Sequence, residues 1–364
     1  MFQSRRFDSV FQRAALSRPH LRGPRSLARA FALGASLLAL SACGPDAENT
    51  TENSSTNPLE EGGPVEMTVT AAFTAVEGGN SVVGFLPDPQ APSLGFVLSA
   101  PRNGGIDIFD LDGLLKTRHA GERLTGLATA PNFELRGESL PLIFGAATDS
   151  SAVRGYAVIR DGAQVLDLPL GEIEPIDGVS GLCLLREGAG FVELVILGTG
   201  ARAEIWRIRD AGDDLLDVER IRDFPLPDPA RQCATFDGDI YTASPAGGLA
   251  RLSHEGTLLA DAAYPAANLT VGEFNGTRLV LATNGSGDTV ETFDAASLEA
   301  GISIDIVDGL STPGVGTPAG LAVTDANYGY TAYVNGLLAV FDAETGRLKV
   351  VSRDVLTRAV FANE

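Results

Sequence analysis

A unit of three or four short strands recurs along most of this chain, and it constrains the fold more than any other feature of the sequence. One strand of the unit is a short run that is apolar or alternates apolar with polar residues, often after a glycine, a pattern typical of β-strands. Its copies lie at 105–110, 155–160, 203–208, 248–252, 288–294 and 336–342. They follow one another at intervals of roughly 40–50 residues, within the range of repeat proteins.

Two further strands accompany these copies. A more apolar strand precedes each copy, at 94–100, 142–147, 192–197, 240–243, 279–283 and 330–334. A strand with small residues at its centre comes before several of these, at 125–128, 180–183, 232–235 and 319–323. Small side chains fit where strands crowd around an axis, so the sequence predicts an all-β, six-bladed β-propeller. A five- or seven-bladed ring and a pair of β-sandwiches remain alternatives. We expect residues 67–75 to close the ring by pairing with a terminal blade.

The first 42 residues predict the signal peptide of a bacterial lipoprotein. Seven arginines precede an apolar run at 30–40, and its length of about 11 residues suits a signal peptide rather than a membrane span. The run ends in Leu40-Ser41-Ala42-Cys43, which predicts cleavage after Ala42 and lipidation of Cys43. Several acyl chains would then hold the protein on a membrane. The alternative is an ordinary cleaved signal peptide followed by a coincidental cysteine.

The lipidated cysteine is expected to begin a tether. Residues 43–66 are polar and acidic and rich in Asn, Ser, Thr, Gly and Pro, a composition typical of a disordered linker. Residues 67–364 then form the propeller domain. We expect a cell-envelope lipoprotein, on the periplasmic side or at the outer membrane.

The charge of the chain restricts its partners. The sequence has 27 basic and 47 acidic residues, a net charge of −20, and removal of the signal peptide makes the remainder more acidic still. Long-range repulsion would keep such a surface away from nucleic acid. We expect a monomer whose partner, besides the membrane reached through the lipid, is a phosphorylated small molecule or a protein of the envelope.

The two cysteines beyond the lipidation site are Cys183 and Cys233, one repeat apart. They would occupy the same inner strand in neighbouring blades. In an oxidising compartment this spacing allows a disulfide between blades. Two separate, buried, small apolar side chains are the alternative.

Several segments resemble the beta-propeller phytases in order and spacing, from about Met67 onward. The most specific are Gly-Gly-Ile-Asp-Ile-Phe-Asp-Leu-Asp-Gly at 104–113, Gly-Leu-Cys-Leu at 181–184, and Cys233 in the next blade. The resemblance implies a six-bladed 3-phytase that hydrolyses the phosphomonoesters of phytate in an acidic axial cleft, with calcium as cofactor. Calcium prefers oxygen ligands, and a bound metal polarises phosphoryl oxygens and activates water.

The chain differs from the family pattern where inner strands begin, the positions at which the resemblance places the acidic ligands. Leu127, Arg231 and Ala319 stand where the family segments have Asp, Glu and Asp. The sequence therefore predicts no metal ligands and leaves catalytic residues unassigned. Arg102, Arg123 and Arg231 are candidates for binding phosphate, and a salt bridge at the rim is the alternative for Arg231.

Three functions follow from these observations. One is a membrane-tethered, phytase-like phosphatase that grips phosphate with arginines. Another is a non-catalytic propeller that binds a ligand or a protein on the cell envelope, and the third is a surface scaffold. Loss of the acidic residues favours the last two.

Overall fold

The computed structural model describes residues 63–362. The predicted signal peptide, Cys43 and nearly all of the predicted linker lie outside these residues. Within the described part, no helix combines the length and the apolar character needed to cross a bilayer.

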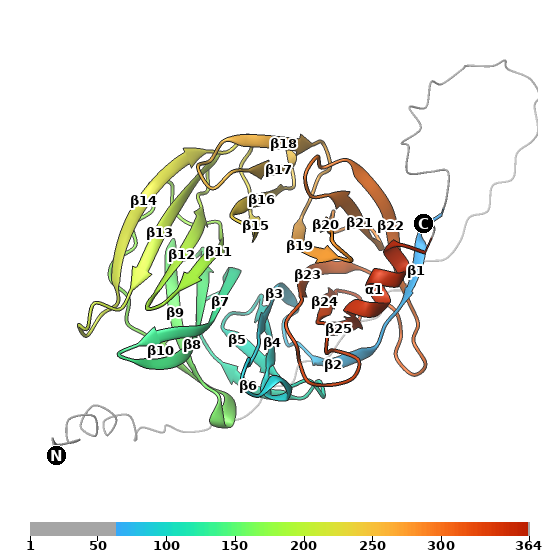
Figure 1. Ribbon diagram of the computed structural model, residues 1–364, viewed down its shortest axis with the longest axis horizontal. Helices are drawn as coiled ribbons and strands as arrows, with labels where there is room; N and C mark the ends of the chain where they lie inside the picture. Colours follow the sequence, from blue (N-terminus) through green and yellow to red (C-terminus); the bar gives the residue numbers. More distant parts are fainter. Residues whose placement is uncertain (1–62, 363–364) are drawn as a thin grey trace, which may run out of the picture. The chain divides into compact units, whose positions relative to one another are not determined.

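The described residues form six sheets, which stand as blades around a central axis (Figure 1). This confirms the six-bladed propeller over the five- and seven-bladed rings and the sandwiches. Each blade begins at its inner strand and steps outward along the chain. Strands that follow one another in the chain within a blade pair antiparallel. In chain order, the blades comprise β3 (Asn80–Leu86), β4 (Phe96–Pro101), β5 (Ile106–Phe109) and β6 (Leu115–His119); β7 (Leu124–Leu135), β8 (Glu138–Ala147), β9 (Ala152–Ile159) and β10 (Gln164–Leu168); β11 (Gly181–Gly188), β12 (Phe191–Leu197), β13 (Arg202–Arg209) and β14 (Asp217–Pro225); β15 (Gln232–Phe236), β16 (Asp239–Ser244), β17 (Gly248–Leu252) and β18 (Leu258–Ala262); β19 (Asn268–Phe274), β20 (Thr277–Thr283), β21 (Thr289–Asp294) and β22 (Ala300–Val307); and β23 (Pro318–Thr324), β24 (Leu337–Asp342) and β25 (Arg347–Ser352).

The inner strands pack against one another around the axis, which explains their small residues. A Cβ atom on Gly126 would lie 2.5 Å from the backbone nitrogen of Leu182 in the next blade. A Cβ atom on Gly181 would lie 2.3 Å from the backbone oxygen of Arg231 in the blade after that. Real Cβ atoms do not approach backbone this closely, so these two contacts between blades require glycine.

Two strands from the N-terminal end of the domain close the ring. Strand β2 (Ala71–Ala75) pairs antiparallel with β25 and completes blade six. Strand β1 (Val65–Thr68) pairs parallel with β22 and adds a fifth strand to blade five. The expected closure by residues 67–75 is confirmed for blade six, and the extension of blade five is a further feature of the structure.

The sixth blade corrects one part of the predicted repeat. Residues 330–334 were expected to form a strand, but they form turns between β23 and β24. The segment 336–342 is therefore the second strand of its blade, whereas its counterparts in the other blades are third strands. The offset arises because the outermost strand of this blade, β2, comes from the other end of the domain.

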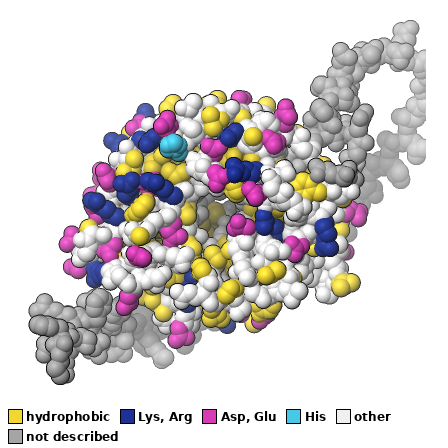
Figure 2. Space-filling model, viewed as in Figure 1, with side chains coloured by type: hydrophobic (Ala, Val, Ile, Leu, Met, Phe, Trp, Pro, Cys, Tyr) yellow, Lys and Arg dark blue, Asp and Glu magenta, His cyan; other side chains and the backbone are white. Residues whose placement is uncertain are grey.

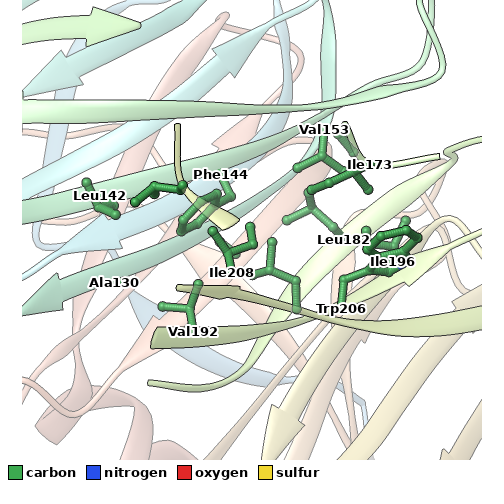
Figure 3. Packing of buried hydrophobic residues seen from close by; sticks show 14 of the residues in the cluster. Ala130, Leu142, Phe144, Val153, Ile173, Leu182, Val192, Ile196, Trp206 and Ile208 are labelled. Carbon is green, nitrogen blue, oxygen red and sulfur yellow. The ribbon is translucent and has the colours of Figure 1, made fainter. Parts of the chain in front are cut away.

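Apolar side chains fill the spaces between neighbouring blades. Figure 3 shows one such cluster, which contains Phe144 of blade two and Leu182 and Trp206 of blade three. A helix, α1 (Arg353–Val360), follows β25 and buries Leu356 and Ala359 against the cluster of blades five and six. Each large apolar side chain removed from water in this way stabilises the fold by about 1.5–3 kcal/mol.

A disulfide joins Cys183 and Cys233, with 5.6 Å between their Cα atoms. Cys183 lies on β11 and Cys233 on β15, the inner strands of blades three and four. Both cysteines are also part of the apolar cluster between these blades. The bond therefore fixes the position of one blade relative to its neighbour.

Removal of this disulfide is expected to weaken the domain measurably. The double substitution Cys183→Ser with Cys233→Ser should lower the free energy of unfolding by about 2–4 kcal/mol, as expected when a long loop in the unfolded chain is released. Urea unfolding followed by tryptophan fluorescence would measure the change, since Trp206 is the single tryptophan. The unsubstituted protein in excess reductant is the control and should lose a similar amount. An unchanged urea midpoint in both samples would contradict a disulfide between the blades.

Candidate functional site

The axis of the propeller holds a cavity of about 310 Å³ that is lined by all six inner strands. Figure 2 shows the ring hollowed at its centre. The side chains that line the cavity are apolar or neutral, and the polar ones include Thr129, Thr235, Asn268 and Thr270. No charged side chain of the described residues lines it. The cavity therefore offers hydrogen bonds and apolar contact to a ligand, but no charge.

Apolar side chains occupy axial positions where the resemblance to phytases implies carboxylates. Leu127, Leu269 and Val271 all line the cavity. Ala319 is at another position where the resemblance places an acid. Its backbone oxygen accepts a hydrogen bond of 3.2 Å from the side-chain amide of Asn268 in the neighbouring blade. Carbon side chains and occupied amides do not form the oxygen-rich shell that calcium requires.

Neutral polar groups near the starts of the inner strands are used to join blades. The Thr125 hydroxyl of blade two donates to the backbone oxygen of Ser180 at 2.8 Å. The Ser180 hydroxyl lies 2.9 Å from the backbone oxygen of Ala230, at the entry to blade four. These side chains satisfy backbone oxygens where the strands approach the axis, so they act in the packing of the ring.

Gln232 makes the longest of these connections. Its side-chain amide donates to the backbone oxygen of Thr125 at 2.8 Å. Gln232 begins the inner strand of blade four, whereas Thr125 is on the inner strand of blade two, so the contact passes over blade three. This bond crosses the end of the axis at which the inner strands begin. That is the place where the resemblance to phytases puts the metal and substrate.

The three predicted phosphate-binding arginines lie at the same end of the blades but in different connections. Arg102 follows β4, Arg123 precedes β7 and Arg231 precedes β15. Arg123 forms an exposed salt bridge with Asp149 at 3.0 Å. Arg102 and Arg231 are exposed and form no salt bridge with any residue in 63–362, so the rim salt bridge considered for Arg231 is absent there. Nothing in their contacts joins the three arginines in one site.

The donor set of the described residues does not fit a calcium cluster. Within 63–362, no three side chains of His, Cys, Asp or Glu lie close enough together to hold a metal ion. This agrees with the side chains at the axis, where Leu127, Leu269 and Val271 stand in place of the expected acids.

A second feature was missed by sequence reasoning: a basic groove between blades three and four. It has a volume of about 410 Å³. Strands of blade three supply its floor, and Gly238 and His254 of blade four supply a wall. We use the name basic groove for the cavity lined by Leu185, Arg186, Glu193, Ile205, Arg207, Ile221, Arg222, Gly238 and His254.

A buried carboxylate organises the basic groove. Arg186, Glu193 and Arg207 are direct neighbours across β11, β12 and β13. The Glu193 carboxylate accepts hydrogen bonds from Arg186 at 2.6 and 2.8 Å and from Arg207 at 2.6 and 3.0 Å. The hydrogen bonds from Arg186 lower the pKa of Glu193, and those from Arg207 add to this effect. Burial acts in the opposite direction but is outweighed, so the carboxylate stays ionised. Both guanidinium groups also lie against the Phe191 ring, at 5.5 and 5.4 Å from its centroid.

The rest of the groove adds positive charge without a matching acid. Arg222 is exposed, and its side chain forms no salt bridge within the described part of the chain. His254 is exposed and lies 3.9 Å from Glu255. Glu219 faces Arg207 from β14 in the strand register but does not line the groove. The lining holds three guanidinium groups and one carboxylate, so its net charge is +2 when His254 is neutral. Figure 2 shows Lys and Arg side chains gathering over blade three.

A third cavity, of about 920 Å³, lies at the outer part of blade two. Arg154 is the one cationic side chain among the described residues of its lining and donates to Glu122 at 2.8 Å, whereas Asp167, Glu172 and Glu174 leave the net charge of the lining at −3. The unmatched charge of this cavity is therefore negative, opposite in sign to that of the basic groove.

Comparisons with known proteins support the fold and nothing finer. No protein-family model matches the chain, and no curated protein matches it. The solved structure of U3-55K matches with a TM-score of 0.51 at 10% identity, over 78% of this chain and 98% of that chain. The WD40 beta-propeller domain of Doa1 matches with a TM-score of 0.47 at 14% identity, over 79% of this chain and 96% of that chain. The beta-propeller domain of Cps50 (Swd1) from Myceliophteria thermophila matches with a TM-score of 0.48 at 12% identity, over 78% of this chain and 99% of that chain. At such low identity, the likeness concerns the architecture alone.

Proposed function

We propose that this chain is a lipoprotein of the bacterial cell envelope whose propeller is a non-catalytic binding module. The observation that carries this proposal is the chemistry of the axis. Leu127, Leu269 and Val271 occupy positions that a calcium-dependent phosphatase of this shape would give to ligands. The amide of Gln232 is committed to a bond between blades. An axis built in this way supports the ring and supplies neither metal ligands nor a base.

The tether is part of the same proposal. The segment before Cys43 has the charge, length and small residues of a lipoprotein signal. Lipidation of Cys43 would hold the propeller near a membrane, where a binding module gains a high local concentration of envelope partners. The beta-propeller phytases, on this proposal, are relatives that share the scaffold.

A phytate assay tests the absence of catalysis. The chain from residue 43 onward, with Cys43→Ser to avoid lipidation, contains the whole described domain. We expect no release of phosphate from phytate above the uncatalysed rate, with or without millimolar calcium, because the described residues supply no metal cluster. Turnover that a chelator abolishes would refute the proposal.

The same sample permits a check that does not depend on activity. A ligand that binds only the folded state raises the melting temperature by mass action. We expect the melting temperature to change equally with calcium and with magnesium, as a general ionic effect. A rise specific to calcium would reveal a site and would count against a non-catalytic axis.

A further inference from the structure

The basic groove is an unusual feature in a protein with a net charge of −20. Its cations come from three different strands of blade three, with His254 added from blade four. The disulfide between Cys183 and Cys233 belongs to the apolar cluster shared by these two blades. Floor and wall are thus covalently fixed relative to each other. A rigid site loses little conformational freedom when it binds a partner.

The arginines of the groove are held in place but keep free donors. Arg186 and Arg207 each use Nε and Nη2 for Glu193. The Nη1 group of each guanidinium makes no bond to that carboxylate and remains available, since a guanidinium carries five N–H donors. Arg222 lines the groove, and within residues 63–362 no hydrogen bond or salt bridge occupies its guanidinium group. Guanidinium groups fixed by a carboxylate and an aromatic ring are suited to binding further carboxylates.

Apolar and basic side chains alternate across the floor of the groove. Each of three strands contributes one pair, namely Leu185 with Arg186 on β11, Ile205 with Arg207 on β13, and Ile221 with Arg222 on β14. Strand β12 lies between β11 and β13, so the row crosses four strands and three intervals. At about 4.8 Å for each interval, the row spans about 14 Å, the length of roughly four extended residues. A single small anion would engage only part of this row. An extended polypeptide is long enough to cover the whole row, and it matches the row when the face turned to the groove carries both acidic and apolar side chains.

We propose that the basic groove binds an extended, acidic segment of a partner protein. Its carboxylates would pair with Arg186, Arg207 and Arg222, and its apolar side chains would pack on Leu185, Ile205 and Ile221. The inference rests on the binding function proposed above and names the partner class. Because the attraction is confined to the groove in an otherwise acidic protein, a uniformly acidic polymer without apolar residues binds more weakly.

Fluorescence anisotropy with a defined peptide tests this proposal. The probe is a labelled hexapeptide of sequence Glu-Glu-Leu-Leu-Glu-Glu, which carries glutamate and leucine on each face of an extended chain. It is mixed with the chain from residue 43 onward that carries Cys43→Ser. We expect saturable binding that weakens about tenfold in Arg222→Gln, the loss typical of one charge-assisted contact, and further in Arg222→Glu. Arg222 makes no salt bridge within residues 63–362, so these variants should unfold at the same urea concentration as the unsubstituted protein.

Arg202→Gln is the matched control, because Arg202 lies at the opposite end of β13 and pairs with Asp177 and Asp223. It should bind the peptide normally. Equal binding by Arg222→Gln and the unsubstituted protein would overturn the proposal, as would equal binding of a peptide with glutamine in place of glutamate. Full displacement of the peptide by an equal concentration of phenyl phosphate would make the groove a small-anion site and would also overturn it. None of these results bears on the phytate and calcium assays, so failure of the groove and failure of the non-catalytic function are separable.

Discussion

Replacing Asp342 with alanine is expected to lower the free energy of unfolding by about 3–5 kcal/mol, because it leaves a buried ammonium group without its carboxylate. Asp342 and Lys349 lie on adjacent strands of blade six, and both side chains are about 1% exposed. Their charged groups are 2.8 Å apart. The Asp342 carboxylate also accepts hydrogen bonds from the Thr345 hydroxyl and from the backbone N–H groups of Gly316, Thr317 and Glu344. The substitution therefore removes one charge and several buried hydrogen bonds together.

Two companion variants identify the cause of the loss. Lys349→Met should cost less than Asp342→Ala, because the remaining carboxylate keeps its other donors. Lys116 is the only other lysine of the chain, and its salt bridge with Asp110 is largely exposed. Lys116→Met should change the free energy by less than about 1 kcal/mol, as for other surface pairs. Urea unfolding of the three variants would rank them, and an Asp342→Ala variant as stable as Lys116→Met would contradict this reasoning.

The same pair makes the stability of the domain depend on pH. Burial acts to raise the pKa of Asp342, but the hydrogen bonds from Lys349, Thr345 and Thr317 outweigh it, so the pKa lies below its ordinary value of 3.8. A depressed pKa means that the unfolded chain takes up a proton more readily than the folded one. The contribution of Asp342 is thus complete above the ordinary aspartate pKa and is lost as the pH falls through the lower, folded value.

The closing strand is the second place where a single substitution should have a large effect. Phe73 of β2 is 1% exposed, and its ring centroid lies 5.9 Å from that of Phe109 in blade one. The neighbouring Thr74 bonds through its backbone N–H and its hydroxyl to the backbone oxygen of Gly113 in the turn before β6. Phe73 therefore fills the junction where the last blade meets the first. Phe73→Ala should cost about 3–5 kcal/mol, the usual range for a buried phenylalanine.

Proteolysis would show whether this loss is a loss of ring closure. Phe73→Ala should expose the segment before β3 to a protease at urea concentrations that leave blades two to four intact. Phe133→Ala, which removes a fully buried ring from blade two, is the matched control. It should lower stability by a similar amount without favouring cleavage before β3. Identical cleavage patterns in the two variants would argue against a special role for the closing strand.

The blades could be predicted from sequence because their signals are local. Apolar runs such as 142–147 and small-residue strands such as 180–183 carry their structural reason within a few positions. In the sixth blade, a strand was wrongly predicted at 330–334, because the strand that completes this blade is β2, far away in the chain. No local pattern near 330–334 indicates that the outer position is already taken.

The site was less accessible to sequence reasoning than the fold. The loss of acids at the axis was visible, since it needs only a comparison of residue types at aligned positions. The basic groove was not, because Arg186, Arg207 and Arg222 meet only through the register of β11, β13 and β14. An arginine every second residue at 207 and 209, and again at 220 and 222, is the one sequence signal that could have drawn attention to blade three. It does not reveal that Glu193 would bind two of the groove's arginines.

The closure by β2 also sets the order in which the molecule can be completed. The backbone N–H of Ser352 donates to the Thr70 hydroxyl, 282 residues away in the chain. Contacts of such high sequence separation carry a large entropic cost of loop closure and slow folding. A chain that emerges from a ribosome or an export channel N-terminus first must hold this segment unpaired until the last blade arrives. Once β25 has formed, its edge stays open until β2 pairs with it, and a β2 segment from another molecule can pair there instead. Exchange of this strand between copies is therefore the characteristic hazard of the fold.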